Sequence, residues 1–363
     1  MSAPLRSVVL AGGGTAGHVS PLLALADELR RRHPELVITC VGTQTGLEAR
    51  LVPERGYPFL TIPRVPLPRR PTLDLLRLPR RLAGSVRAAL DILRAQQAQV
   101  VVGFGGYVST PVYLAARRLG VPVVVHEQNA RPGLANRVGA RFARAVAVTF
   151  PGTPLSGAVR TGMPLRRQIA DLDRAARRVE ARTAYGIDPG LPTLLVTGGS
   201  LGAQRLNEAF AGAAAELSAA GVAVIHLCGR GKGFAPATVP GGAPYIVREY
   251  AEAIELAYAA ADLVVARSGA STVCELSAVG LPAIYVPLPI GNGEQRLNAA
   301  DLVGRGGGLL VADSEVTTPW VREVVIPFVT DPGALAAMAA AAAEAGERDG
   351  DKLLADLVEG AVR

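Results

Sequence analysis

Aromatic side chains and lysine are both scarce in this sequence. Aromatic residues make up 4% of the 363 residues, and Lys232 and Lys352 are the only lysines among 38 basic residues. Proteins that bind RNA or single-stranded DNA commonly stack bases on aromatic side chains, so the composition argues against a nucleic-acid partner. The formal net charge of +7 therefore favours a different anionic partner, either a phosphate-bearing substrate or an acidic membrane surface.

Cysteine is equally sparse. Cys40, Cys228 and Cys274 lie far apart in apolar surroundings, so they fit neither a disulfide framework nor a zinc site. We expect reduced thiols in the core of a cytoplasmic protein. Met1 is not followed by a basic-then-apolar leader, and no run of about 20 apolar residues is present to span a bilayer.

Short β-branched segments alternate with helical patterns along most of the chain, which is typical of parallel α/β sheets. The predicted strands cover residues 7–11, 37–42, 100–103, 123–126 and 145–149 in the first half, and 193–197, 222–228, 263–266, 283–286 and 308–311 in the second. This pattern predicts two Rossmann-like, doubly wound domains, facing each other across a cleft at the carboxyl ends of their strands. We place them at residues 1–163 and 164–347, with a terminal helix over about 348–363 that could pack on the first domain.

Three glycine-rich loops fall between a predicted strand and a helix, at residues 12–17, 198–204 and 267–272. Such loops let backbone N–H groups approach a phosphate, whereas a single one can serve only as a tight turn. The first has the spacing of a dinucleotide fingerprint, but the second strand ends Cys40-Val41-Gly42-Thr43-Gln44 without the acid that would hold a ribose. The three loops together therefore favour a phosphate-rich ligand other than a nicotinamide cofactor.

No Asp-x-Asp motif stands at the end of a predicted strand, where it would hold a metal-bound diphosphate. The pairs Asp171/Asp173 and Asp349/Asp351 lie in charged helical or terminal stretches. We therefore expect backbone amides and helix dipoles, rather than a metal ion, to stabilise a diphosphate. The sequence predicts neither a metal ligand set nor a cofactor.

His18 follows the first glycine loop at the start of a helix. With an ordinary pKa of about 6.5, a histidine can accept a proton near neutral pH, and the helix N-terminus favours its neutral form. The alternative is a hydrogen-bonded residue that only begins the helix. His126 and His226 lie in apolar strands and are predicted to be core residues, and His33 is predicted to lie at a solvated helix end.

Glu275 lies three residues after Thr272, which allows two interpretations. It can complete a Thr-x-x-Glu capping box, or its carboxylate can accept hydrogen bonds from the ribose of a nucleotide. Two polar clusters, at residues 126–129 and 293–298, are also predicted at the edge of the cleft. They could bind a sugar, or they could simply be solvated.

Residues 64–87 are rich in arginine, and their first part is broken by prolines. An apolar stripe at helical spacing follows, flanked by guanidinium groups: Leu75, Leu78, Leu82 and Val86, with Arg77, Arg80 and Arg81. This arrangement suits a surface helix resting on anionic lipid headgroups. The alternative is a helix that packs the stripe on its own sheet.

Taken together, the motifs resemble one family. They are Gly12-Gly13-Gly14-Thr15-Ala16-Gly17-His18, Gly103-Phe104-Gly105-Gly106-Tyr107, His126-Glu127-Gln128-Asn129, Gly198-Gly199-Ser200-Leu201-Gly202-Ala203 and Arg267-Ser268-Gly269-Ala270 with Glu275. In this order they are similar to the MurG family of glycosyltransferases, which make lipid II in peptidoglycan synthesis. The resemblance implies a GT-B fold and a metal-independent, inverting transfer of N-acetylglucosamine from UDP-N-acetylglucosamine to undecaprenyl-pyrophosphoryl-MurNAc-pentapeptide (lipid I). It also implies a peripheral protein on the cytoplasmic face of an anionic membrane, with cell-wall assembly proteins as further partners.

The resemblance also assigns roles to residues. Thr15, Ala16 and Gly17 would lie at the donor sugar and the acceptor diphosphate, Asn129 and Gln295 at the sugar, and Arg166 and the backbone of Ala251 at the uracil. Ser200 would bind the diphosphate, and Glu275 would bind the ribose. The start of a helix would contact both the diphosphate and the ribose, through Ala270, Ser271, Thr272, Val273 and Cys274. This sequence departs from the usual pattern at Ala16, Met163, Tyr250 and Glu294. An ionised Glu294 cannot donate the hydrogen bond of the usual glutamine, which affects the expected sugar contacts.

The implied mechanism needs one general base. His18 is the first candidate and Glu127 the second, and the sequence does not choose between them. A family-28-like transferase with another acceptor, a UDP-sugar epimerase and a non-catalytic UDP-sugar sensor remain alternatives.

Overall fold

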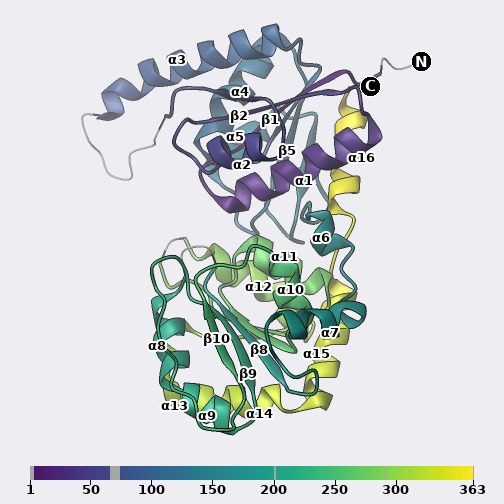
Figure 1. The fold of residues 1–363 in the computed structure, drawn as a ribbon. Helices are drawn as coiled ribbons and strands as arrows, with labels where there is room; N and C mark the ends of the chain where they lie inside the picture. The colour runs from purple at the N-terminus through teal and green to yellow at the C-terminus, as the bar shows by residue number, and fades with distance from the viewer. Residues whose placement is uncertain (1–3, 66–73, 200–201, 291, 363) are drawn as a thin grey trace. The chain divides into compact units, whose positions relative to one another are not determined.

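The computed structural model describes residues 4–65, 74–199, 202–290 and 292–362, and of residues 74–77 the backbone alone. The chain divides into two compact units (Figure 1). Unit 1 comprises Met1–Arg166 and Arg348–Arg363, and unit 2 comprises Arg167–Glu347.

Unit 1 is a three-layer α/β structure. Its strands are β1 (Ser7–Ala11), β2 (Val37–Gly42), β3 (Phe59–Thr61), β4 (Val100–Gly103), β5 (Val123–Glu127), β6 (Ala145–Val148) and β7 (Ala158–Arg160). Its helices are α1 (Ala16–Arg32), α2 (Glu48–Glu54), α3 (Asp74–Ala95), α4 (Gly106–Leu119), α5 (Leu134–Gly139) and α16 (Gly350–Ala361). The seven strands are parallel, in the order β3-β2-β1-β4-β5-β6-β7.

Both faces of the unit 1 sheet are covered, because successive strand residues point to opposite sides. Val8 and Leu10 of β1 face a core shared with α1 and α16, whereas Val9 and Ala11 face a core shared with α3 and α4. The C-terminal helix α16 contributes Leu354 to the first of these cores. The end of the chain is therefore part of unit 1.

Unit 2 repeats the same architecture. Its strands are β8 (Thr193–Thr197), β9 (Ala223–Leu227), β10 (Tyr245–Arg248), β11 (Leu263–Ala266), β12 (Ala283–Tyr285) and β13 (Leu309–Leu310). Its α-helices are α6 (Arg167–Ala170), α7 (Arg174–Ala184), α8 (Gln204–Gly212), α9 (Ala214–Ala219), α10 (Ile254–Ala260), α11 (Ala270–Ala278), α12 (Glu294–Gly304), α13 (Thr318–Trp320), α14 (Ile326–Val329) and α15 (Pro332–Ala345). A 3-10 turn (Asp313–Glu315) and a π-helical turn (Val321–Val325) complete it.

The unit 2 sheet is also parallel, in the order β10-β9-β8-β11-β12-β13. Strand β8 lies in its middle, and the side chains of Leu194 and Val196 face a core built with α8. The predicted doubly wound α/β fold is therefore confirmed for both halves of the chain. The sequence reading missed the short strands β3, β7 and β10.

The predicted core histidines are confirmed. Burial lowers the pKa of His126 to about 4, and the ring contacts the Gly162 carbonyl oxygen at 3.0 Å. Burial also lowers the pKa of His226 to about 4, and its ring contacts Tyr245 and Asn207 at 2.7 and 3.0 Å. Both rings are therefore neutral structural groups near neutral pH.

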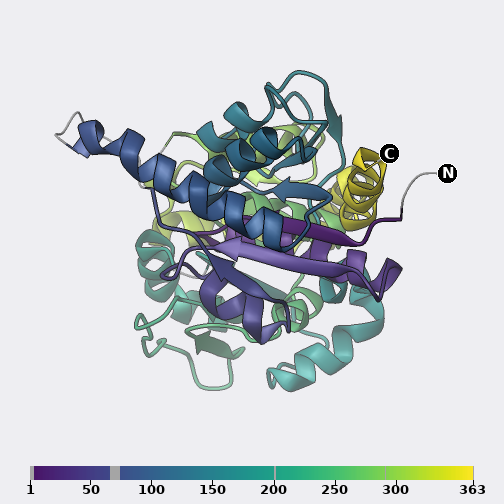
Figure 2. The same ribbon diagram turned by 90° about the horizontal axis from the view of Figure 1, so that it is seen from above.

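Helix α3 carries the predicted membrane stripe, and in Figures 1 and 2 its N-terminal end projects beyond the sheet. The prediction that Val86 faces lipid is wrong, because its side chain is 3% exposed and packs in the core against α4. Leu82 packs against the same core, and Leu78 is half-buried. The side chains of Leu75 and Arg77 lie outside the described residues.

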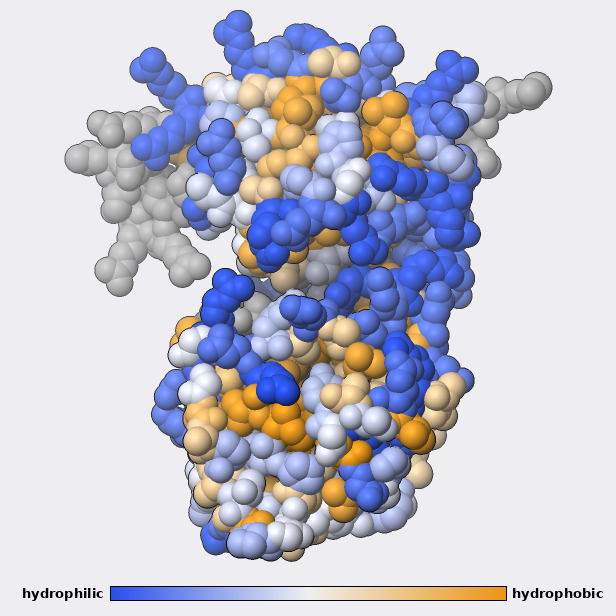
Figure 3. All heavy atoms as spheres, viewed as in Figure 1, coloured by the Kyte–Doolittle hydropathy of each residue, from blue (hydrophilic) through white to orange (hydrophobic). Residues whose placement is uncertain are grey.

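The outer face of α3 is polar. Arg80 and Arg81 are exposed, and on the face drawn in Figure 3 hydrophilic side chains project from the edge of unit 1 along which α3 runs. Within the described residues, no single helix has the length and apolar character needed to cross a bilayer. One helix pair, Thr318–Val329 and Pro332–Ala361, meets the two criteria jointly but is bent by 82°.

Candidate functional site

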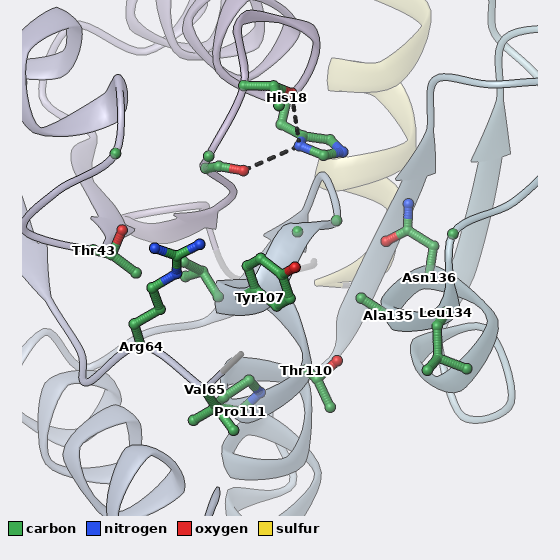
Figure 4. A pocket seen from close by; sticks show the side chains of 18 of the residues that line it. His18, Thr43, Arg64, Val65, Tyr107, Thr110, Pro111, Leu134, Ala135 and Asn136 are labelled. Carbon is green, nitrogen blue, oxygen red and sulfur yellow. Dashed lines mark hydrogen bonds between the residues drawn. The ribbon is translucent and has the colours of Figure 1, made fainter. Parts of the chain in front are cut away.

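A pocket of about 550 Å³ opens in unit 1 where β1, β4 and β5 end. Because parallel strands present their carboxyl ends at one edge, the loops after these strands meet there. The first glycine loop, the start of α4 and the segment after β5 line the pocket together. Figure 4 shows His18, Tyr107 and Asn136 around it, each from a different loop or helix start.

Two glycines permit this close packing of loops. Gly14 has φ of +90°, which side chains rarely adopt. Gly106, at the start of α4, has φ of +78°, and a Cβ atom there would lie 2.6 Å from the carbonyl oxygen of Gly13. A larger residue at position 106 would therefore push the two loops apart.

Glu48 is a central residue of the pocket that the sequence reading missed. Its carboxylate is buried and accepts hydrogen bonds from the Gly14 N–H at 2.8 Å, the Thr43 N–H at 3.0 Å and the Thr43 hydroxyl at 2.9 Å. Burial by itself would raise the pKa of Glu48, but these hydrogen bonds outweigh it and lower the pKa below its ordinary value. An ionised carboxylate thus fixes the first glycine loop. The only signal in the sequence was an acidic residue opening the helix after the second strand.

His18 is the third residue of α1 and lines the pocket. Its Nδ1 lies 3.0 Å from the carbonyl oxygen of Gly13 and 3.2 Å from the hydroxyl of Thr15, as the dashed lines in Figure 4 mark. A carbonyl oxygen only accepts hydrogen bonds, so Nδ1 carries the proton in the neutral ring. The unprotonated Nε2 is then the atom able to accept a proton.

Glu127, the last residue of β5, also lines the pocket but is engaged differently. Its carboxylate accepts hydrogen bonds from the backbone N–H groups of Asn129 and Gly133, both at 2.9 Å, and from the side-chain amide of Asn136 at 3.0 Å. Tyr113 in turn donates to the Asn136 side chain at 2.8 Å. Glu127 therefore holds the loop that presents Asn129 to the pocket.

Unit 2 has a pocket of about 580 Å³ at the same edge of its own sheet. The second glycine loop lines it, together with Arg267, Thr272 and Gln295. Gly202 is required there, because it has φ of +65° and a Cβ atom would lie 2.0 Å from the carbonyl oxygen of Cys228. Gln295 accepts a hydrogen bond from the Leu288 N–H at 2.9 Å through Oε1, so its amide NH₂ can still donate to a ligand.

The structure corrects the capping-box interpretation of Glu275. Helix α11 begins at Ala270 with Gly269 as its N-cap, so Thr272 lies inside the helix and cannot cap it. Glu275 instead accepts a hydrogen bond from the Tyr258 hydroxyl of α10 at 2.8 Å. The carboxylate is half-buried in unit 2.

The predicted site residues fall into three groups. Thr15, His18, Glu127 and Asn129 are brought together in the unit 1 pocket, and Thr272 and Gln295 in the unit 2 pocket. Several others belong to the same elements without lining either pocket: Ala16, Gly17, Ala270, Ser271, Val273, Cys274 and Glu275, as well as Ala251 ahead of α10 and Arg166 at the end of unit 1. Ser200 lies outside the described residues. Glu294, the departure that affected the expected sugar contacts, does not line the unit 2 pocket.

Within the residues that the structure describes, no cluster of three or more histidine, cysteine, aspartate or glutamate side chains is arranged to hold a metal ion.

Comparison with known proteins shows similarity to one family of glycosyltransferases along nearly the whole chain. Residues 8–148 match the glycosyltransferase family 28 N-terminal domain, and residues 193–354 match the family 28 C-terminal domain. A UDP-N-acetylglucosamine–N-acetylmuramyl-(pentapeptide) pyrophosphoryl-undecaprenol N-acetylglucosamine transferase from Streptomyces avermitilis is 58% identical over 357 residues, 98% of each chain. The transferase of the same name from a Nocardioides species is 58% identical over 355 residues, 97% of each chain.

Solved structures agree with this relationship. The crystal structure of Acinetobacter baumannii MurG superposes with a TM-score of 0.78 at 28% identity, covering 98% of this chain and 100% of that one. A calicheamicin glycosyltransferase, at a TM-score of 0.67 and 20% identity over 99% of each chain, shares the fold. The fold is therefore GT-B, and the chain belongs to glycosyltransferase family 28, among the pyrophosphoryl-undecaprenol N-acetylglucosamine transferases of the MurG type.

Proposed function

We propose that this protein transfers N-acetylglucosamine from UDP-N-acetylglucosamine to the 4-hydroxyl of MurNAc in lipid I, which gives lipid II for peptidoglycan synthesis. The observation that carries the proposal is the 58% identity over 98% of both chains with a transferase named for this reaction. The likeness spans both units, and each unit has a pocket at the carboxyl edge of its sheet. A two-substrate transferase needs two such sites.

The proposed chemistry is a single displacement. The acceptor hydroxyl attacks the anomeric carbon of the donor, the bond to the UDP oxygen breaks on the opposite face, and the attacking hydroxyl loses its proton to a base. We assign that base to His18, because its Nδ1 donates to Gly13 and its Nε2 is unprotonated in the neutral ring. Glu127 is the weaker candidate, since its carboxylate is buried and already accepts hydrogen bonds from Asn129, Gly133 and Asn136.

Unit 2 is proposed to bind the donor. The glycine loop after β8 and the N-terminus of α11 offer backbone N–H groups to the diphosphate without a metal ion. Gln295 would donate to the sugar, and Glu275 would accept hydrogen bonds from the ribose hydroxyls. The hydrogen bond from Tyr258 orients the Glu275 carboxylate for that role.

Membrane association is proposed to be peripheral. The exposed Arg80 and Arg81 on α3 provide positive charge for anionic headgroups, each contributing about 1 kcal/mol near such a surface. Val86 is excluded from this contact because it is a core residue.

The proposed function is tested by incubating the full chain with UDP-N-acetylglucosamine and a soluble short-chain lipid I analogue in excess EDTA. We expect mass spectrometry to detect the acceptor with one added N-acetylhexosamine, because amides and helix dipoles take the place of a cation at the diphosphate. Hydrolysis or epimerisation of the donor without acceptor glycosylation would contradict the function. Transfer that occurs only after Mg²⁺ is restored would contradict the metal-free mechanism alone.

His18→Ala should lower kcat by about 10²- to 10⁴-fold, the usual contribution of a positioned base. The affinity for UDP should not change, since the residues proposed to bind its diphosphate and ribose belong to unit 2. Steady-state kinetics and calorimetric titration with UDP measure the two quantities. Glu127→Gln is the comparison: a larger loss of kcat in Glu127→Gln than in His18→Ala would reverse the assignment of the base.

Glu275→Ala should lower kcat/KM for the donor by about 10- to 150-fold, corresponding to about 1.5–3 kcal/mol for hydrogen bonds to a charged group. Tyr258→Phe is the matched control, because it removes one hydrogen-bond donor to Glu275 but leaves the carboxylate, so its effect should be smaller. Unchanged donor kinetics in Glu275→Ala together with a lower melting temperature would assign Glu275 a purely structural role.

A further inference from the structure

Among the described residues, two acidic side chains line the unit 1 pocket. They are Glu48 and Glu127, and each carboxylate accepts hydrogen bonds from backbone N–H groups. In the case of Glu48 the donor belongs to the first glycine loop, a type of loop that commonly offers its N–H groups to phosphates. Glu48 accepts from the Gly14 N–H at 2.8 Å, and Glu127 from the Gly133 N–H at 2.9 Å. An anionic ligand in this pocket therefore meets two fixed negative charges, and it needs a cation to offset them.

Arg64 is the cation that the pocket provides. Among the described residues that line the pocket, it is the only arginine or lysine. Its guanidinium lies over the Tyr107 ring, 5.3 Å from the ring centre, and Figure 4 shows it beside Tyr107 and Thr43. The side chain is exposed, and no ion pair involves it within the described part of the chain.

The backbone around Arg64 is anchored, although its side chain is exposed. The Ile62 N–H donates to the Gly42 carbonyl oxygen at 3.1 Å, and the Ser85 hydroxyl of α3 donates to the Pro63 carbonyl oxygen at 3.0 Å. Val65, the next residue, is 5% exposed. The segment thus holds the guanidinium at the pocket while leaving its N–H groups available to a ligand.

We propose that Arg64, stacked on Tyr107, binds the diphosphate of the lipid-linked acceptor. A guanidinium presents a planar fork that matches two phosphate oxygens, and stacking on an aromatic ring fixes the plane of that fork. Thr15, the N-cap of α1, and His18, the third residue of that helix, line the same pocket. The arginine compensates for Glu48 and Glu127, and it would favour acceptors with two phosphates over those with one or none.

This inference rests on the proposed function but can be measured without turnover. Farnesyl diphosphate, farnesyl monophosphate and farnesol are the probes, titrated into the full chain by calorimetry. We expect Arg64→Gln to weaken farnesyl diphosphate binding by about 10- to 100-fold, the range for charge-assisted hydrogen bonds. Farnesol binding should be unchanged. The affinity of Arg64→Lys for farnesyl diphosphate should lie between those of Arg64→Gln and wild type, since lysine keeps the positive charge but lacks the planar guanidinium.

Arg117→Gln is the matched control. Arg117 is also exposed and lies over an aromatic ring of unit 1, 5.1 Å from the centre of Phe142, but it does not line the pocket. Its substitution should leave all three titrations unchanged. In transfer assays, Arg64→Gln should raise KM for the acceptor and leave KM for UDP-N-acetylglucosamine unchanged.

The outcomes separate this inference from the proposed function. Equal farnesyl diphosphate affinity in wild type and Arg64→Gln would overturn the role of Arg64, even in an active transferase. A KM effect that disappears when the pentapeptide is removed from the acceptor would also overturn it, because the guanidinium would then bind a peptide carboxylate. If the wild-type protein transfers nothing, the proposed function fails, and the titrations still decide whether Arg64 binds a diphosphate.

Discussion

The hydrogen bonds between the buried Glu48 carboxylate and the first glycine loop are the constraint on which the unit 1 site depends. Glu48 and Gly14 are 34 residues apart, and they meet because β1 and β2 are neighbours in the sheet. The carboxylate fits only beside residues without side chains: a Cβ atom at Gly13 would lie 2.3 Å from its Oε1 atom. The loop then presents the Gly13 carbonyl oxygen that orients His18.

The same contact explains why a dinucleotide-like fingerprint does not make a dinucleotide site here. In a Rossmann nucleotide site the glycine-loop amides face a pyrophosphate, and an acid at the end of the second strand holds the ribose. In this chain the acidic residue is Glu48, at the start of α2, and its carboxylate accepts a hydrogen bond from the Gly14 N–H of the glycine loop itself. The first glycine loop thus donates a hydrogen bond to a carboxylate of the protein itself.

Much of the fold could be predicted from the sequence, because buried parallel strands are short β-branched runs between helical patterns. The strands β3 and β7 were missed because three residues are too few to show a pattern. Periodicity identified α3 and its apolar stripe, but a stripe does not reveal what it packs against, and Val86 proved to be a core residue. The capping box at Glu275 failed for a similar reason, since Gly269 rather than Thr272 begins α11.

The site was less predictable than the fold. Motif residues such as His18, Glu127 and Asn129 were identified and do share one pocket. Glu48 and Arg64 were not recognised as pocket residues, because their relevance comes from contacts between loops distant in sequence. No local pattern distinguishes a glutamate that seats a glycine loop from one that only opens a helix.

We propose that the first glycine loop fixes His18 as a base with an unprotonated Nε2 atom, through the contact between Nδ1 and the Gly13 carbonyl oxygen. The most direct test is ¹⁵N NMR of the histidine side chains near neutral pH, with His18 assigned by comparison with His18→Ala. We expect a neutral ring in which Nδ1 carries the proton and Nε2 has the chemical shift of an unprotonated nitrogen. A ring protonated on Nε2, whether as the other neutral tautomer or as imidazolium, would contradict it.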